Sequence, residues 1–161
     1  MTIEIGQGAV VGLLGPNGSG KTTAISCILG LLRPQAGSVS LWGTRLGFDL
    51  PPGNDRRIGV LLEDTRLPPF LSVRSALGLV CRIRGLATTA ARSELDRVIA
   101  AAGVEALLER RVSVLSKGQA RRVGLAAALV GDPPLLILDE PSAGLDVNAR
   151  EEFNVLVRSL R

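Results

Sequence analysis

Apolar residues lie along the chain in short continuous runs and in helically spaced sets. The continuous runs cover 9–14, 58–62 and 135–138. Short apolar runs bounded by turn residues are typical of strands buried in a parallel sheet. Between 37 and 46 apolar and polar residues alternate instead, which predicts an antiparallel hairpin with a turn near Trp42. The chain therefore has strands of both kinds.

Helically spaced apolar residues predict helices between these strands. The first helix follows the run 9–14 and is expected to close at Arg33 and Pro34. Three more are expected in the middle of the chain: one capped by Ser72, one ending at Gly103 and a short one over 104–111. Further helices follow Ser116 and the last apolar run, and a loop is expected at 49–55. The order predicts one α/β domain over 1–161, with a small antiparallel β subdomain and an inserted helical subdomain at 72–118.

The composition favours a folded globular domain over a nucleic-acid-binding, secreted or membrane-spanning protein. With 161 residues, 46% hydrophobic and 21% charged, the chain suits one folded domain. Its net charge is +4, but the arginines are scattered and aromatics make up 2%, so we expect no nucleic-acid partner. We expect no secretory signal and no membrane span, because no apolar run approaches about 20 residues. Cys27 and Cys81 lack metal spacing and are expected to be buried free thiols in a reducing compartment.

Residues 15–23 read GPNGSGKTT and fit the G-x-x-x-x-G-K-[ST] pattern of a phosphate-binding loop. The glycines allow backbone N–H groups to face phosphate oxygens, and the following helix N-terminus adds positive potential. The alternative is a glycine-rich turn with a chance lysine, which the predicted strand and helix on either side disfavour. Lys21 is expected at the β- and γ-phosphates, Thr22 at Mg²⁺ and Thr23 at the α-phosphate. The full expected set is Gly15, Pro16, Asn17, Gly18, Ser19, Gly20, Lys21, Thr22 and Thr23.

A second candidate lies where the run 135–138 ends, at Asp139 and Glu140. An aspartate at the carboxyl end of a buried strand beside a phosphate loop can hold Mg²⁺, usually through water. Glu140 follows directly and could accept a proton from the attacking water, so we expect it to be catalytic together with Lys21. Alone, the pair would fit a solvated turn equally well.

The stretch LSKGQ at 115–119 supports two interpretations. Ser116 and Gln119 have the spacing of a capping box that opens a helix, and a capped helix N-terminus is itself an anion site. Together with the phosphate loop, Asp139-Glu140 and SAGLD at 142–146, the stretch closely resembles the ATP-binding cassette family, in the family's motif order. The resemblance implies a P-loop ATPase fold. It also implies that Ser116 and Gly118 contact the nucleotide of a second cassette in a head-to-tail dimer, and that 142–146 touches this partner.

Three features depart from the family pattern. Lys117 stands where glycine is commonest, and Glu63 stands where the family usually has a metal-binding glutamine; Glu63 is expected to bind Mg²⁺ as well. No aromatic residue precedes the phosphate loop, and the chain has no histidine for the family's switch position. The resemblance therefore implies a cassette truncated at both ends, which we expect to hydrolyse ATP poorly in isolation.

The resemblance implies an ATP-binding and ATP-hydrolysing transporter subunit, docked on a transmembrane permease at the cytoplasmic face of the cell membrane, with ATP and Mg²⁺ as cofactors. The motif forms resemble drug or lipid exporters more than importers. Two alternatives remain: a shortened cassette that binds nucleotide or a partner without efficient turnover, and a non-transport ATPase of the same class. Guanine-nucleotide switches are disfavoured because no N-K-x-D motif is present.

Overall fold

The structure is a computed structural model that describes residues 2–16, 18–46 and 57–160. The described residues divide into two compact units, 2–46 and 57–160, and each is described by itself. The loop predicted at 49–55 lies outside the described residues. Within the described ranges, no helix has both the length and the apolar character needed to cross a bilayer.

The predicted hairpin is present in the first unit. Strand β1 (Ser40–Leu41) pairs antiparallel with β2 (Thr44–Arg45), and the turn between them consists of Trp42 and Gly43. Both turn residues have positive φ angles, 51° and 77°. A two-residue hairpin turn with φ positive at both positions matches the twist of the flanking strands. The hairpin prediction is confirmed.

Helix α1 (Lys21–Ile28) follows the phosphate loop, as predicted, but ends earlier than Arg33. Gly30 has a φ of 71°, and the Leu31 N–H donates to the Ser26 carbonyl at 2.9 Å. This is the backbone arrangement of a Schellman motif, in which a left-handed glycine stops the helix. The glycine, and not the Arg33–Pro34 step, ends α1.

The apolar run 9–14 is not a strand in the structure, so that prediction is wrong for the described residues. Val10 and Leu14 are 63% and 94% exposed. A buried parallel strand requires hydrogen-bonded neighbours on its edges. The only strands described in its own unit are the two-residue strands β1 and β2, which pair with each other.

The second unit contains most of the predicted elements. They are β3 (Ile58–Leu61), α2 (Val73–Ile83), α3 (Thr88–Ala102), α4 (Lys117–Leu129), β4 (Leu135–Leu138) and α5 (Val147–Ser159). Ser72 caps α2, and Gly103 ends α3 in the left-handed conformation, as predicted. The short helix expected over 104–111 is instead a 3₁₀ turn at Glu105–Leu107, followed by another at Val112–Val114. Segments this short do not sustain an α-helix.

Strands β3 and β4 form a parallel pair. Ile58 lies opposite Leu135, and Leu61 lies opposite Leu138. Their carboxyl ends therefore share one edge of the sheet. Strand β4 is half-buried along its length and not buried on both faces as predicted, since the described sheet contains only these two strands.

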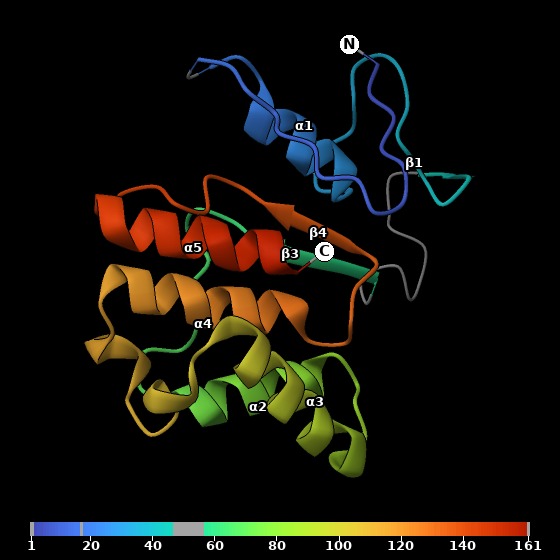
Figure 1. Ribbon diagram of the computed structural model, residues 1–161. Helices are drawn as coiled ribbons and strands as arrows, with labels where there is room; N and C mark the ends of the chain where they lie inside the picture. The colour runs from blue at the N-terminus through green and yellow to red at the C-terminus, as the bar shows by residue number, and fades with distance from the viewer. Residues whose placement is uncertain (1, 17, 47–56, 161) are drawn as a thin grey trace. The chain divides into compact units, whose positions relative to one another are not determined.

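Helix α4 is the centre of the second unit. It lies between α5 on one side and α2 with α3 on the other, and it also contacts β3 (Figure 1). Two glycines permit the close approach to β3. A Cβ atom on Gly59 would lie 2.3 Å from the Ala128 carbonyl oxygen, and one on Gly124 would lie 2.8 Å from Leu61 Cδ1. A side chain at position 59 would push the strand away from the α4 backbone, whereas one at position 124 would displace the end of the Leu61 side chain.

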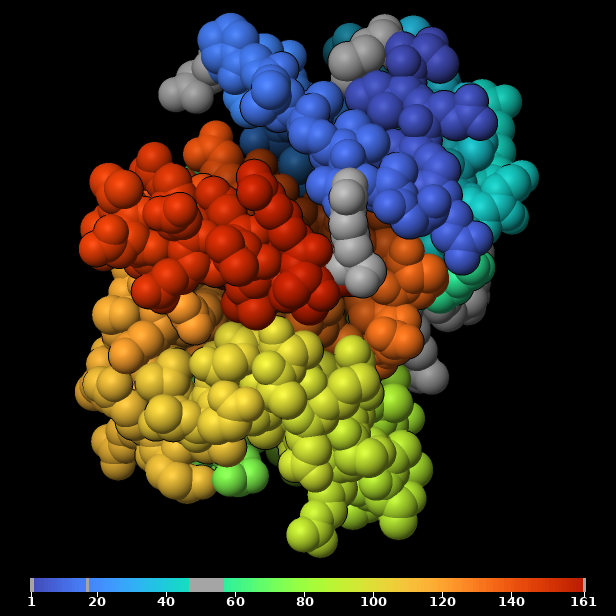
Figure 2. All heavy atoms as spheres, viewed as in Figure 1, coloured from blue at the N-terminus to red at the C-terminus, as the bar shows by residue number. Residues whose placement is uncertain are grey.

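The core of this unit joins residues from all its helices and from β3. Members with almost no exposed surface are Leu61, Leu77, Val98, Leu125 and Phe153. Cys81 belongs to this core, and burial raises the pKa of its thiol, which fits a packing residue. Cys27 is also a free thiol but is only half-buried. In Figure 2, α5 is the red segment. Val147 and Val155 of this helix are 77% and 60% exposed.

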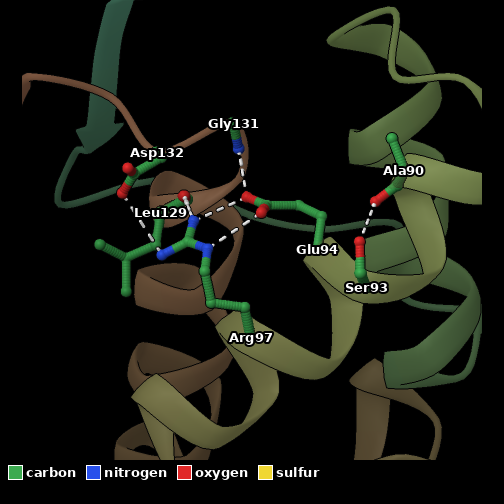
Figure 3. Close-up of polar contacts among 7 residues, drawn as sticks. All are labelled: Ala90, Ser93, Glu94, Arg97, Leu129, Gly131 and Asp132. Carbon is green, nitrogen blue, oxygen red and sulfur yellow. Dashed lines mark hydrogen bonds and ion pairs between the residues drawn. The ribbon is translucent and has the colours of Figure 1, made fainter.

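A polar cluster joins α3 to the C-terminal end of α4 (Figure 3). Arg97 donates to the Glu94 carboxylate, at 2.9 and 2.6 Å, and to the Leu129 carbonyl at 2.7 Å. Glu94 also accepts the Gly131 N–H at 2.5 Å, while Arg97 lies 3.5 Å from the Asp132 carboxylate. We call these residues the α3–α4 clamp. They satisfy backbone groups where α4 ends and the chain turns toward β4.

The clamp predicts a specific pH dependence of stability. The hydrogen bonds from Arg97, and to a lesser extent from the Gly131 N–H, lower the pKa of Glu94. A carboxyl group with a lowered folded-state pKa stabilises the fold above its unfolded pKa of about 4.3, and this stabilisation is lost as the pH falls through the folded-state pKa. We expect Glu94→Gln to lower the free energy of unfolding at pH 7 and to weaken the further loss on acidification.

Urea unfolding at pH 7 and over a series of pH values from about 5 down to about 2 measures this effect, because the loss develops below the unfolded pKa. Glu109→Gln is the matched control, because the Glu109 carboxylate pairs with Arg74 at an exposed position, where a pair contributes little. Equal acid sensitivity of wild type and Glu94→Gln would show that the clamp carboxylate does not titrate with folding.

Candidate functional site

The phosphate loop leads directly into α1 in the first unit. Gly20 is the N-cap of α1, with a φ of 92°, and no side chain caps the helix. The N–H groups of a first helical turn have no acceptors within their own helix, and this arrangement favours an anion at the helix N-terminus. The loop is closed by a hydrogen bond from the Ser19 N–H to the Pro16 carbonyl at 3.1 Å. A Cβ atom on Gly15 would lie 2.6 Å from Ser19 Oγ, so the closed loop has no room for one.

Lys21 lies across this loop. Its Nζ donates to the carbonyls of Gly15 at 2.8 Å and Pro16 at 3.0 Å. The ammonium group is thus held over the loop by neutral acceptors, which a phosphate oxygen can replace. Thr22 and Thr23 are exposed in the first turn of α1. Asn17 lies outside the described residues, whereas Gly18 is described and has a φ of 80°.

The carboxyl edge of the β3–β4 pair holds the predicted acidic residues. Asp139 is 9% exposed, and its N–H extends the ladder by donating to the Leu61 carbonyl at 2.8 Å. Glu140 is exposed and has a φ of 44°, and its carbonyl accepts the Ala143 N–H at 2.9 Å. A left-handed conformation is unfavourable for a residue with a side chain, and such positions cluster at functional sites. The strand therefore ends in one buried and one exposed carboxylate.

Glu63 follows β3 at the same edge, and its backbone is held by a residue that sequence reasoning missed. The Arg121 side chain, 7% exposed, donates to the carbonyls of Leu62 at 2.9 Å and Glu63 at 2.7 Å. One signal was available in the sequence. Arg121 precedes the buried Leu125 by four positions, and residues four apart share one face of a helix. A charged residue on a buried face requires a partner.

The LSKGQ stretch forms the N-terminus of α4 and confirms the predicted capping box. Ser116 Oγ accepts the Gln119 N–H at 3.2 Å, and Gln119 Oε1 accepts the Ser116 N–H at 3.0 Å. Arg110 also donates to Gln119 Oε1, at 3.2 Å. This helix end is therefore fixed by a reciprocal pair of bonds and by a neighbouring arginine.

The α4 N-terminus lies against the segment 142–146. A Cβ atom on Gly118 would lie 3.5 Å from Ala149 Cβ, which is ordinary contact with α5. The Lys117 side chain extends over Gly144, where a Cβ atom would lie 2.0 Å from Lys117 Nζ. Asp146 caps α5 by accepting the Ala149 N–H at 2.9 Å. Ser116 to Gly118 and 142–146 thus form one continuous surface, which we call the signature surface.

The second unit therefore brings the acidic edge and the signature surface together on α4, β3 and β4. The phosphate loop belongs to the first unit. Among the described residues, no group of three or more histidine, cysteine, aspartate or glutamate residues could hold a metal ion alone.

Comparison with known proteins identifies the family to which the chain belongs. The family model described as ABC transporter matches residues 1–143. The chain belongs to the ABC transporter family. Its fold is accordingly that of an ABC-type ATPase, with helices beside a parallel strand pair and a small antiparallel hairpin.

Two curated relatives illustrate the range of the family. The chain is 42% identical to the molybdenum import ATP-binding protein ModC of Mycobacterium tuberculosis, over 98% of this chain and 45% of that protein. It is 40% identical to the Nod factor export ATP-binding protein I of Burkholderia pseudomallei, over 99% of this chain and 52% of that protein. The chain thus spans about half the length of these relatives.

Solved structures of ABC proteins are similar as well. CbiO1 from Clostridium perfringens, part of the ABC transporter complex cbiONQ, matches with a TM-score of 0.80 and 29% identity, over 91% of this chain and 60% of that one. A dimeric ATP-binding cassette bound to ADP and Pi matches with a TM-score of 0.81 and 26% identity, over 98% and 72% of the two chains.

The capping geometry predicts matched losses of stability. Ser116 Oγ and Ser72 Oγ each accept an N–H three residues ahead at 3.2 Å. We expect Ser116→Ala and Ser72→Ala each to lower the free energy of unfolding by about 1 kcal/mol, because each leaves a helix N–H without its acceptor. Urea denaturation measures both. An unchanged stability in Ser116→Ala would contradict the capping role.

Proposed function

We propose that the chain is the ATP-binding and ATP-hydrolysing part of an ABC transporter. The observation that carries this proposal is the start of α1, where an uncapped helix N-terminus follows GPNGSGKTT and the Lys21 ammonium lies on the loop carbonyls. Positive charge and free backbone donors at one loop suit a polyphosphate. In this proposal the loop residues Gly15 to Thr23 hold the phosphates, and Lys21 shifts from carbonyl oxygens to phosphate oxygens.

The metal side of the proposed site consists of Thr22, Asp139 and Glu63. Mg²⁺, when bound, would neutralise charge on the phosphates. Asp139 supports this role because it is a buried carboxylate at a strand end and the ladder fixes its backbone. Glu140 would accept the proton of the attacking water, since it is the exposed carboxylate that directly follows the metal residue.

The signature surface would complete the site of a second cassette. Ser116 and Gly118 lie at a capped helix N-terminus, which favours an anion. We propose that they contact the γ-phosphate held by the phosphate loop of a partner in a head-to-tail dimer. The dimeric state of the similar cassette bound to ADP and Pi supports this arrangement.

The proposed partner outside the dimer is a transmembrane permease, at the cytoplasmic face of the cell membrane. One of these relatives is named as an import protein and the other as an export protein, so the direction of transport does not follow from them. Binding at the loop, hydrolysis at Glu140 and dimer formation through the signature surface would together drive the permease.

The role of Glu140 gives the most specific test of this proposal. In a chain extended to the length of its relatives, we expect Glu140→Gln to keep the ATP affinity of the unsubstituted protein but to lower the rate of phosphate release by about 100-fold or more, because the amide cannot accept the proton. Calorimetric ATP binding and steady-state phosphate release measure the two effects. Glu109→Gln, which alters an exposed carboxylate on the surface, is the control and should change neither.

The same variant tests the dimer. Since Glu140→Gln retains ATP, it should accumulate an ATP-bound dimer, visible by analytical ultracentrifugation. Adding Ser116→Ala should remove that dimer, whereas adding Ser72→Ala, which removes an equivalent cap, should not. Undiminished hydrolysis in Glu140→Gln would refute the catalytic assignment, and equal dimer loss in both double variants would refute the role of Ser116.

A further inference from the structure

Arg121 is an unusual residue for the interior of the second unit. It is 7% exposed, and the described residues offer it no ion pair with a carboxylate. Its guanidinium group instead donates to two consecutive backbone carbonyls, those of Leu62 at 2.9 Å and Glu63 at 2.7 Å. Buried arginine is costly unless its donors are satisfied, so these two bonds hold both the side chain and the segment it grips.

The gripped segment is fixed from two sides. The Leu61 carbonyl accepts the Asp139 N–H at 2.8 Å, and the next two carbonyls accept from Arg121. The Leu62 N–H is also bound, to Thr65 Oγ1 at 2.8 Å. The backbone that carries Glu63 is therefore anchored to β4 at one carbonyl and to α4 at the following two.

Arg121 also connects Glu63 to the signature surface. It lies five residues after Ser116, the N-cap of α4, in the same continuous helix. The rise over five helical residues is about 7.5 Å, and a hydrogen-bonded helix transmits displacement along its axis as a stiff rod. A movement of the α4 N-terminus therefore moves the two donors that hold the Glu63 backbone.

We propose that Arg121 is a positioning residue that acts through Glu63. It sets where the Glu63 carboxylate stands relative to Mg²⁺ and links that position to the signature surface. The inference rests on the proposed function, in which Glu63 binds Mg²⁺ with the nucleotide. Arginine suits the task because its planar fork offers two donors to adjacent carbonyls, whereas lysine presents one point-like charge.

The structure offers a matched control for a merely structural role. Arg84 donates to the Ile58 carbonyl at 3.0 Å, at the opposite end of β3. Both arginines therefore donate to backbone carbonyls of the segment 58–63, but only Arg121 does so at Glu63. Arg84→Gln should therefore reproduce any general destabilisation of β3 without changing the Mg²⁺ dependence of ATP binding.

The experiment measures ATP affinity of the full chain by calorimetry over a series of Mg²⁺ concentrations, from which the half-saturating Mg²⁺ concentration follows. We expect Arg121→Gln to raise that concentration about tenfold, as loss of a residue that orients a metal ligand does elsewhere. The ATP affinity without Mg²⁺ should stay the same. In a Glu63→Ala background, adding Arg121→Gln should change the Mg²⁺ dependence less than twofold, because the residue through which Arg121 acts is gone.

Two further measurements complete the test. Hydrogen exchange without nucleotide should show faster exchange at amides 62–65 in Arg121→Gln, and Arg121→Lys should be intermediate in both exchange and Mg²⁺ dependence. If Arg121→Gln fails to fold, Arg121→Lys provides the same two measurements. An equal Mg²⁺ shift in the wild-type and Glu63→Ala backgrounds, or an equal shift in Arg84→Gln, overturns the inference while leaving nucleotide binding intact. A wild-type chain that binds no ATP with or without Mg²⁺ overturns the proposed function and the inference together.

Discussion

The parallel register of β3 with β4 is the constraint on which the second unit depends. Because Leu61 pairs with Leu138, the next residues of both strands, Leu62 and Asp139, leave the sheet at the same edge. Helix α4 packs on one face of this pair, where the missing Cβ atom of Gly59 permits close approach to the Ala128 carbonyl. The same helix begins at the signature surface and ends at the α3–α4 clamp. One buried helix thus sets the position of the acidic edge at one end of the strands and of the turn into β4 at the other.

This arrangement explains why the charged residues of the unit occur where they do. Asp139 and Arg121 are its buried charged residues among those described, and both lie at the carboxyl edge of the strands. The described buried polar side-chain atoms all have hydrogen-bond partners. Lys117 extends over Gly144 without a hydrogen bond or an ion pair to a described residue, so its charge is available at the signature surface.

Much of this organisation could be predicted from the sequence, because local signals decided it. The cap at Ser72, the reciprocal pair Ser116 and Gln119, and the left-handed Gly103 each act within a few residues.

Most of the wrong predictions concern structure that depends on residues far away in the sequence. The run 9–14 has the composition of a buried strand, but a strand also requires neighbours, which composition does not specify. Helix α1 was predicted to end at Arg33 and Pro34, because proline is a strong helix-ending signal. The left-handed Gly30 ends it earlier. Arg121 was missed because its acceptors are the carbonyls of a segment almost 60 positions away, and backbone carbonyls leave no trace in a sequence pattern. The candidate site residues could be proposed from motifs, whereas the contact that holds the Glu63 backbone could not.

The most direct test of the proposed function, in which the phosphate loop and the acidic edge would serve one nucleotide, is calorimetric ATP binding with Mg²⁺ and with a chelator. Wild type, Lys21→Ala and Asp139→Ala should be compared. Lys21→Ala should weaken ATP binding in both conditions by about 10-fold or more, because a charge-assisted hydrogen bond to phosphate contributes about 1.5–3 kcal/mol. Asp139→Ala should bind ATP as wild type does in chelator and lose only the increase in affinity that Mg²⁺ provides. If Mg²⁺ strengthens binding equally in wild type and Asp139→Ala, the acidic edge does not belong to the nucleotide site.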